Sequence, residues 1–193
     1  MMVKICGITN REDALEAVEA GASAIGFNFY RESPRYISHT GAAMIGEKIP
    51  AKVWKVGVFV NETADSIAKI MIDAGLDVAQ LHGTSAARGV RGWRAISPDM
   101  DIKIPMPKDV EAVLIDSPAD GISGGSGKTW DWTRSPDLGY KIIIAGGLDA
   151  ENVRTAIEQA HPWGVDACSR IEKAPGIKDH EKMRRFIHAA LNS

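Results

Sequence analysis

The chain has 193 residues, of which 45% are hydrophobic and 25% are charged. That length and balance predict a single globular domain over residues 1–193, which can bury a core without disulfides or metals. The 23 Lys and Arg residues nearly balance the 25 Asp and Glu residues, for a net charge of −2. This excludes the strong positive field of a protein that binds nucleic acid or an anionic membrane.

Only two cysteines occur, Cys6 and Cys168, which excludes a disulfide framework and a structural zinc site built from cysteines alone. No apolar run approaches the roughly 20 residues that span a bilayer. The first residues enter a strand pattern at once, unlike a secretory signal peptide. We therefore expect a soluble cytoplasmic protein whose thiols are reduced.

Short apolar runs alternate with amphipathic stretches from the first residue onward. Thr9 or Asn10 is a candidate N-cap of the first helix, and Gly21 is its stop signal. The first half of the chain predicts strands at residues 3–6, 24–29, 53–60 and 78–82, and helices at 11–20, 40–48 and 64–74.

The middle of the chain carries weaker signals. Residues 85–96 fit a helix weakened by Gly89 and Gly92, and residues 101–106 then fit the fifth strand. Pro105 and Pro107 leave little room for a helix before the next strand. We therefore expect the fifth helix to be missing or reduced to one turn.

The last third resumes the alternation, with strands at residues 112–116, 140–145 and 165–169 and helices at 150–160 and 179–191. Most strand interiors are continuously apolar, as in parallel strands covered on both faces. Eight strands that alternate with helices predict an α/β fold, a single (β/α)8 TIM barrel. A doubly wound open sheet is the competing topology.

In such a barrel, function resides where strands end and the next loops begin. Cys6 ends the first strand and is either a buried small hydrophobe or a thiolate that acts as base or nucleophile. Lys4 points to the same side and either lowers the pKa of the thiol or pairs with an interior carboxylate such as Asp166. Asp116 ends the sixth strand, where it either makes a turn with Ser117 or acts as a general acid with a raised pKa.

A glycine-rich segment, residues 124–128, resembles a nucleotide-binding P-loop. However, Ile122 stands where the first glycine of that motif belongs, and no long helix follows. We therefore reject an ATPase and expect a mobile flap or a plain flexible loop, from which Lys128 can reach an anion.

Gly146 and Gly147 follow the seventh strand and precede a helix. Glycines at such a position let backbone N–H groups approach a phosphate, and barrels often bind phosphate at the loops after strands seven and eight. Ser169, Arg170 and the turn at Pro175 and Gly176 would supply the other half of that site.

Arg35 lies in a polar loop after the second strand and is either solvated or aimed at a ligand carboxylate, whose geometry its guanidinium matches. His82 ends the fourth strand with only Gln80 on the same side. No second histidine or acid stands at metal-ligand spacing, so we expect no metal site.

These clusters together resemble the phosphoribosylanthranilate isomerase family of tryptophan biosynthesis. The resemblance covers nearly the whole chain and follows the family's order. It rests on KICGIT at residues 4–9, SPR at 33–35, VGVFV at 56–60, QLHG at 80–83, LID at 114–116, GGSGK at 124–128 with DW at 131–132, AGGL at 145–148, and PG at 175–176 with KD at 178–179.

The resemblance implies a (β/α)8 barrel without a cofactor. It also implies an Amadori rearrangement of N-(5-phosphoribosyl)anthranilate to 1-(2-carboxyphenylamino)-1-deoxyribulose 5-phosphate. In the family, the residue that matches Asp116 is the general acid that opens the furanose ring. The residue that matches Cys6 is the general base that removes the C2′ proton.

The resemblance further implies where the substrate binds. Arg35 is expected near the anthranilate carboxylate, and Gly146, Gly147 and the Ser169 region are expected at the phosphate. Asp166 matches a family active-site position. Lys4, Gln80, His82 and Lys128 complete the residues that we expect in the site.

The sequence departs from the family pattern at the last strand and in the residues after it. The family commonly reads VDVSSGVE there, whereas residues 165–172 read VDACSRIE, so Cys168 replaces a serine and Arg170 replaces a glycine. Arg170 either adds charge to phosphate binding or crowds a backbone donor. Because the first and eighth strands are neighbours in a closed barrel, we expect Cys6 and Cys168 to lie close together. We predict that oxidation couples them and inactivates the enzyme.

Two other functions stay open. The first alternative is another phosphosugar isomerase, which acts in the histidine pathway or on two substrates. Such enzymes usually rely on paired aspartates, whereas the first predicted strand of this chain ends in Cys6 and not in an aspartate. A non-catalytic phosphate-binding barrel would bind ligand without turnover. The expected partner is a small phosphosugar and neither nucleic acid nor membrane, and the sequence is compatible with a homodimer or with association with other tryptophan-pathway enzymes.

Overall fold

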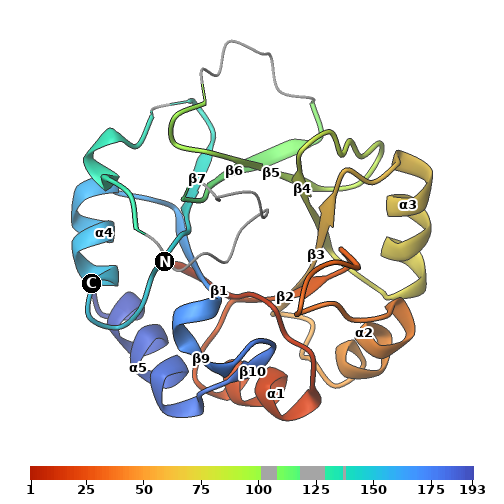
Figure 1. Ribbon diagram of the computed structural model, residues 1–193, viewed down its shortest axis with the longest axis horizontal. Helices are drawn as coiled ribbons and strands as arrows, with labels where there is room; N and C mark the ends of the chain where they lie inside the picture. Colours follow the sequence, from red (N-terminus) through yellow and green to blue (C-terminus); the bar gives the residue numbers. More distant parts are fainter. Residues whose placement is uncertain (101–107, 118–128, 137) are drawn as a thin grey trace.

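The computed structural model describes residues 1–100, 108–117, 129–136 and 138–193. Eight parallel strands follow one another around a closed barrel, with the helices on its outside (Figure 1). The first strand closes the barrel against the last, with Met2 level with Gly164 and Ile5 level with Ala167. The predicted TIM barrel is therefore confirmed, and the open doubly wound sheet is wrong.

The elements follow the predicted alternation over most of the chain. The barrel strands are β1 (Met2–Ile5), β2 (Ala24–Asn28), β3 (Trp54–Val60), β4 (Val78–His82), β5 (Gly92–Ile96), β6 (Val110–Ile115), β7 (Lys141–Ile144) and β8 (Gly164–Ala167). The α-helices are α1 (Arg11–Glu19), α2 (His39–Gly46), α3 (Ala64–Asp73), α4 (Val153–Ala160) and α5 (His180–Leu191). Two 3-10 helices, η1 (Trp132–Arg134) and η2 (Ser169–Ile171), and a hairpin of β9 (Glu172–Ala174) and β10 (Ile177–Lys178) complete the structure.

The fifth strand lies earlier than predicted. β5 occupies the second half of residues 85–96, so the helix expected there is wrong, whereas the strand expected at 101–106 lies outside the described residues. Trp93 and Ala95 are buried in the barrel interior, and this burial outweighs any local preference for a helix. No helix occurs in residues 83–91, 97–100 or 108–109, the described residues between β4 and β6. The other predicted elements are present, with ends displaced by at most three residues.

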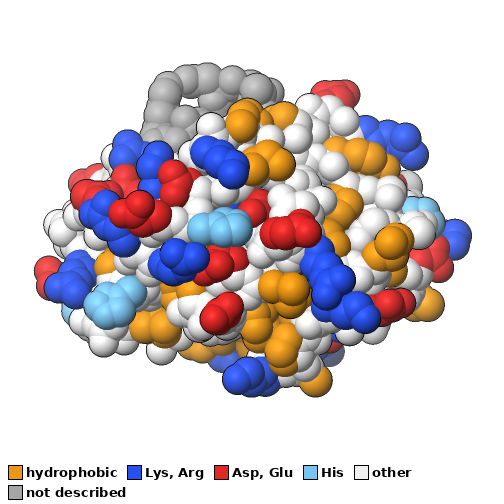
Figure 2. All heavy atoms as spheres, turned by 90° about the horizontal axis from the view of Figure 1, so that it is seen from below, with side chains coloured by type: hydrophobic (Ala, Val, Ile, Leu, Met, Phe, Trp, Pro, Cys, Tyr) orange, Lys and Arg blue, Asp and Glu red, His pale blue; other side chains and the backbone are white. Residues whose placement is uncertain are grey.

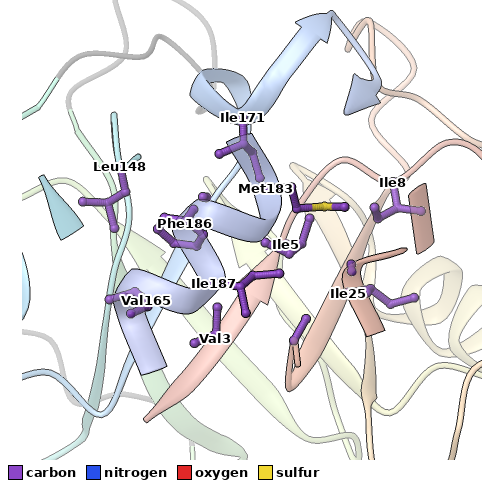
Figure 3. Close-up of a cluster of buried hydrophobic side chains, with 14 of the residues drawn as sticks. Val3, Ile5, Ile8, Ile25, Leu148, Val165, Ile171, Met183, Phe186 and Ile187 are labelled. Carbon is purple, nitrogen blue, oxygen red and sulfur yellow. The ribbon is translucent and has the colours of Figure 1, made fainter. Parts of the chain in front are cut away.

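The largest core cluster lies between the barrel and its outer helices. Val3 and Ile5 on β1 and Val165 on β8 are fully buried and face Phe186 and Ile187 on α5 (Figure 3). Each aliphatic side chain buried in this way stabilises the fold by about 1.5–3 kcal/mol. This packing holds the first and last strands, which carry residues of the site, against the final helix.

Inside the barrel, side chains change from apolar to polar along the strands. Three tryptophans, Trp54, Trp93 and Trp163, pack together near the amino ends of the strands, with ring centroids 5.9–6.2 Å apart. Lys4 and Asp166 lie further along β1 and β8, at the same level as each other. The barrel is thus filled with apolar side chains at one end and has polar groups toward the other.

One face of the molecule carries side chains of both charges. On the face shown in Figure 2, Lys and Arg side chains are interspersed with Asp and Glu side chains. Within the described residues, no helix is both long enough and apolar enough to cross a lipid bilayer.

Candidate active site

A pocket opens at the carboxyl ends of the barrel strands. Described residues at the ends of seven barrel strands, all but β5, contribute to its lining, as do the loop after β2 and the loop after β7. The expected site residues among them are Cys6, Arg35, Gln80, His82, Asp116, Gly146, Gly147, Asp166, Ser169 and Arg170. Lys4 lies buried beside Asp166, whereas Lys128 lies outside the described residues.

Cys6 follows β1 and is 9% exposed. Its backbone N–H donates a hydrogen bond to the carbonyl of Ala167 at 2.9 Å, which extends the pairing of β1 with β8. A hydrogen bond from the Cys168 thiol holds the pKa of Cys6 well below its usual range, against the opposing effect of burial. The positive charges of Lys4 and Lys178 act in the same direction as that hydrogen bond. The environment therefore favours a thiolate at Cys6.

Lys4 pairs with Asp166, one of the two alternatives that the sequence left open. Its Nζ lies 2.8 Å from Asp166 Oδ2, and the two side chains are 0% and 7% exposed. Burial lowers the pKa of Lys4, but the carboxylate of Asp166 and the thiolate of Cys6 outweigh it, so the pKa is raised and Lys4 stays charged. The other alternative also holds, because the same charge lowers the pKa of Cys6.

Asp166 combines a charged partner with a strongly desolvated position. Burial raises its pKa to about 7, although the Lys4 ammonium acts in the opposite direction. Its Oδ1 atom is buried and has no hydrogen-bond partner among the described residues. Because Asp166 lines the pocket, this oxygen is an acceptor available to a ligand.

Asp116 follows β6, which β7 separates from β8 around the barrel. Its backbone N–H donates to the carbonyl of Ile96 at 3.0 Å, and the Ser117 hydroxyl lies 3.5 Å from its Oδ1. Burial, together with the negative charge of Cys6, raises the pKa of Asp116 to about 6. Both predicted features, the contact with Ser117 and the raised pKa, are therefore present.

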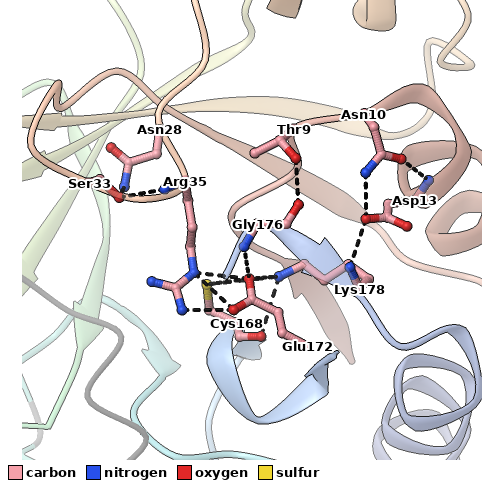
Figure 4. A network of polar contacts seen from close by, with 10 residues as sticks. All are labelled: Thr9, Asn10, Asp13, Asn28, Ser33, Arg35, Cys168, Glu172, Gly176 and Lys178. Carbon is pink, nitrogen blue, oxygen red and sulfur yellow. Dashed lines mark hydrogen bonds and ion pairs between the residues drawn. The ribbon is translucent and has the colours of Figure 1, made fainter. Parts of the chain in front are cut away.

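Arg35 is neither solvated nor free in the pocket, because its guanidinium is paired with Glu172. Arg35 Nε lies 2.9 Å from Glu172 Oε1, and Nη2 lies 2.7 Å from Oε2 (Figure 4). The two side chains are 12% and 4% exposed. Arg35 also lines the pocket, so this ion pair fixes the orientation of a cation at its edge.

Sequence analysis missed Glu172 and Lys178, which face each other across the β9–β10 hairpin. Lys178 Nζ lies 2.8 Å from Glu172 Oε1, and the Lys178 side chain is fully buried. In the sequence, the two stand at nearly equal distances on either side of Pro175 and Gly176, a pair typical of a tight turn. That spacing could have indicated an ion pair, because it makes Glu172 and Lys178 neighbours across a hairpin.

Two glycines create space that the site needs. A Cβ atom at Gly26 would lie 3.0 Å from Cys6 Sγ and 3.1 Å from Lys4 Nζ, so this position makes room for both side chains. A Cβ atom at Gly146 would lie 2.6 Å from the backbone nitrogen of Ser117, and the φ angle of Gly146 is +87°. Gly146 was expected from the sequence, whereas Gly26 was not.

Ser169 and Arg170 lie in η2, directly after β8, and both line the pocket. Arg170 Nη1 lies 2.6 Å from Asp149 Oδ2, and the Arg170 side chain is 43% exposed. Its charge is therefore partly balanced at the rim of the pocket by Asp149.

Gln80 and His82 project from β4. Gln80 Nε2 lies 2.9 Å from His82 Nε2, and the buried Gln80 Oε1 has no hydrogen-bond partner among the described residues. Burial lowers the pKa of His82 to about 4, so the ring is neutral near pH 7. In the part of the chain that the structure describes, no group of three His, Cys, Asp or Glu side chains could hold a metal ion.

A closed barrel of eight parallel strands, with titratable groups in a pocket at their carboxyl ends, defines a (β/α)8-barrel enzyme. The family model of N-(5′-phosphoribosyl)anthranilate (PRA) isomerase matches residues 3–189. This chain belongs to that family.

Individual relatives agree over the full length. The N-(5′-phosphoribosyl)anthranilate isomerase of Solibacter usitatus is 49% identical over 196 residues, covering 98% of this chain and 97% of the relative. The crystal structure of phosphoribosyl anthranilate isomerase from Thermotoga maritima matches with a TM-score of 0.86 and 37% identity over 100% of both chains. A phosphoribosyl anthranilate isomerase in complex with reduced 1-(o-carboxyphenylamino)-1-deoxyribulose 5-phosphate matches with a TM-score of 0.82 and 34% identity, again over 100% of both chains.

Proposed function

We propose that this chain catalyses the Amadori rearrangement of N-(5-phosphoribosyl)anthranilate to 1-(2-carboxyphenylamino)-1-deoxyribulose 5-phosphate, with Asp116 as general acid and Cys6 as general base. The isomerase activity follows from family membership, and the relative solved with the reduced product supports the substrate. One observation carries the assignment of roles. A carboxyl with a raised pKa and a thiol with a lowered pKa line the same pocket from separate strands.

The first step needs a proton donor. Burial raises the pKa of Asp116 to about 6, so a useful fraction of this carboxyl is protonated near neutral pH. Asp116 gives its proton to the furanose ring oxygen, the bond from C1′ to that oxygen breaks, and the anthranilate nitrogen forms a Schiff base with C1′.

The second step needs a base. The Cys6 thiolate removes the proton from C2′, and the electron pair of that C–H bond moves toward the Schiff-base nitrogen to give an enolamine. The enolamine then tautomerises to the ketone of the product. An acid and a base whose pKa values are shifted in opposite directions suit this sequence of steps.

Residues around Asp116 and Cys6 bind the substrate in this proposal. The oriented guanidinium of Arg35 serves the anthranilate carboxylate, and the backbone near Gly146, Gly147 and Ser169 serves the phosphate. Arg170 adds positive charge at the phosphate end, although Asp149 balances part of it. The open acceptor oxygens of Asp166 and Gln80 suit the sugar hydroxyls. No role is assigned to the expected Lys128, which lies outside the described residues.

The test follows the loss of anthranilate fluorescence from phosphoribosylanthranilate. Cys6→Ser and Asp116→Asn should each lower kcat by about 10²–10⁴-fold, the usual contribution of a general acid or base. Asp65→Asn, at an exposed position on α3, is the matched control and should leave kcat unchanged. Activity that survives both pocket substitutions would overturn the assigned roles.

The two alternative functions predict different outcomes when the same purified protein is assayed. Turnover of the histidine-pathway aminoaldose would indicate an isomerase with a second substrate. Binding of the reduced product without any turnover would indicate a non-catalytic barrel. The homodimer and the association with other pathway enzymes stay predictions, for which the molar mass in solution is the test.

A further inference from the structure

We propose that Cys168 is a positioning residue for Cys6, donating its S–H to the Cys6 sulfur and so holding that sulfur as a thiolate that faces the pocket. The inference rests on the proposed role of Cys6 as general base, and it explains what a second thiol does beside the first. Cys168 itself is not assigned any contact with the reacting atoms.

Strand pairing brings the two cysteines together. Lys4 is level with Asp166 and Ile5 with Ala167, and the N–H of Cys6 donates to the carbonyl of Ala167. Cys6 and Cys168 are the next residues along each strand, and both line the pocket.

Glycines leave room for both sulfur atoms. A Cβ atom at Gly7 would lie 3.0 Å from Cys168 Sγ, and one at Gly26 would lie 3.0 Å from Cys6 Sγ. Both distances are tighter than ordinary contacts, so a side chain at either glycine would push a sulfur atom away from its position.

Cys168 is the donor of the pair because its surroundings keep it protonated. Its hydrogen bond to Cys6 and its burial both raise the pKa of Cys168. The thiol has one proton, and the competing acceptor, Glu172 Oε1, lies 3.9 Å from Cys168 Sγ (Figure 4). Lys178 Nζ also lies 3.9 Å from that sulfur, but it is engaged by Glu172 at 2.8 Å and by the Cys168 carbonyl at 3.3 Å.

The charged groups around Cys6 largely balance one another. The charges of Lys4, Lys178 and Arg35 interact with that of Cys6. However, Lys4 is paired with Asp166, and the other two cations share Glu172. Asp116 faces Cys6 from the end of β6 and opposes its ionisation when charged, and His82 on β4 is neutral near pH 7. Lys4 also donates a hydrogen bond to the Cys6 sulfur, and the Cys168 thiol is a second short-range donor whose stabilisation of the thiolate adds to that of these compensated cations.

The experiment compares Cys168→Ala with Cys168→Ser. The chain has two cysteines, so each variant keeps Cys6 as its only thiol. The rate of alkylation by iodoacetamide is measured against pH, and in the wild type the Cys6 and Cys168 peptides are separated by mass spectrometry. A thermal unfolding midpoint for each variant establishes that it is folded.

We expect the Cys168→Ala variant to need a pH about one unit higher for half-maximal alkylation of Cys6, because about tenfold less thiolate is present at a given lower pH. The Cys168→Ser variant, whose hydroxyl is also a donor, should stay close to the wild type. An unchanged midpoint in Cys168→Ala, or an equal shift in both variants, would overturn the inference.

A second readout separates this inference from the proposed function. If Cys6 is the base, the acidic limb of kcat/KM should move with the alkylation midpoint in Cys168→Ala, with kcat affected more than KM. If the midpoint moves but the acidic limb does not, and Cys6→Ser remains active, then Cys6 is not the base, and only the hydrogen bond between the thiols is supported.

Discussion

Lys4 and Asp166 form an ion pair inside the barrel, with Lys4 Nζ 2.8 Å from Asp166 Oδ2 and both side chains buried. They stand level with each other on β1 and β8, the two strands that close the barrel. Removing two charges from water is costly, and their attraction offsets that cost only while both partners are present. The closure of the barrel therefore depends on a pair that also lies next to Cys6.

Lys4→Met should lower the free energy of unfolding by about 3–5 kcal/mol, because it leaves a buried carboxylate without a partner. Burial already raises the pKa of Asp166 to about 7, above the value of an unfolded carboxyl, so its ionisation costs stability as the pH rises. The loss should therefore be greater at pH 9 than at pH 5 in urea unfolding. Lys69→Met, which breaks an exposed pair with Asp73, is the control and should cost less than about 1 kcal/mol. A loss that is equal at both pH values would contradict this prediction.

The pH profile of kcat/KM should be bell-shaped. The general acid must be protonated, so activity should fall as the pH rises above about 6, the raised pKa of Asp116. The general base must be deprotonated, so activity should fall on the acidic side as Cys6 gains a proton. In Asp116→Asn, the residual activity should lack the alkaline limb. An alkaline limb that is identical in this variant would assign it to another group.

Arg35→Lys keeps the charge but loses the planar fork that meets a carboxylate through two nitrogens. We expect KM for phosphoribosylanthranilate to rise about tenfold, because the amine neither holds Glu172 in the same way nor matches the anthranilate carboxylate. Arg91→Lys is the matched control, since Arg91 makes a similar two-nitrogen contact with Glu111 on the surface. Equal KM values in both variants would argue against a binding role for Arg35.

Gly146→Ala should raise KM and lower thermal stability. The new Cβ atom would lie 2.6 Å from the backbone nitrogen of Ser117, so the loop expected to bind phosphate must shift. Gly75→Ala is the control, because Gly75 also has a positive φ, of +59°, but no atom lies within 4 Å of the added Cβ position. Both variants place a non-glycine residue at a positive φ and therefore carry similar backbone strain. Only Gly146→Ala should also weaken the binding of inorganic phosphate. Equal phosphate affinities would remove Gly146 from the proposed site.

Oxidation with diamide should inactivate the enzyme by joining Cys6 to Cys168. Diamide takes up the two electrons and two protons that leave when the sulfur–sulfur bond forms, so intact protein mass should fall by the mass of two hydrogen atoms. Dithiothreitol should restore the mass and the activity. Cys168→Ser should resist inactivation, and undiminished sensitivity of this variant would refute the prediction.

Much of the fold was readable from the sequence, because strands and helices of a parallel barrel have local signals. Apolar runs of strand length, helix caps such as Asn10 and glycine stops predict the elements, and alternation predicts parallel strands. β5 was the exception. Its residues form a strand because Trp93 packs against side chains of other strands inside the barrel. That packing depends on residues distant in the sequence, so it produces no local pattern.

The candidate site also has features that the sequence predicts and features that only the folded structure shows. The sequence by itself determined which polar residues stand at the strand ends, and therefore that Cys6, Asp116 and Asp166 share one end of the barrel. Only the tertiary structure decided which partner each charge has, as with Arg35 and Glu172, which are 137 positions apart. Burial and the charges of distant residues set the pKa of each group, and both depend on contacts that form when the barrel closes.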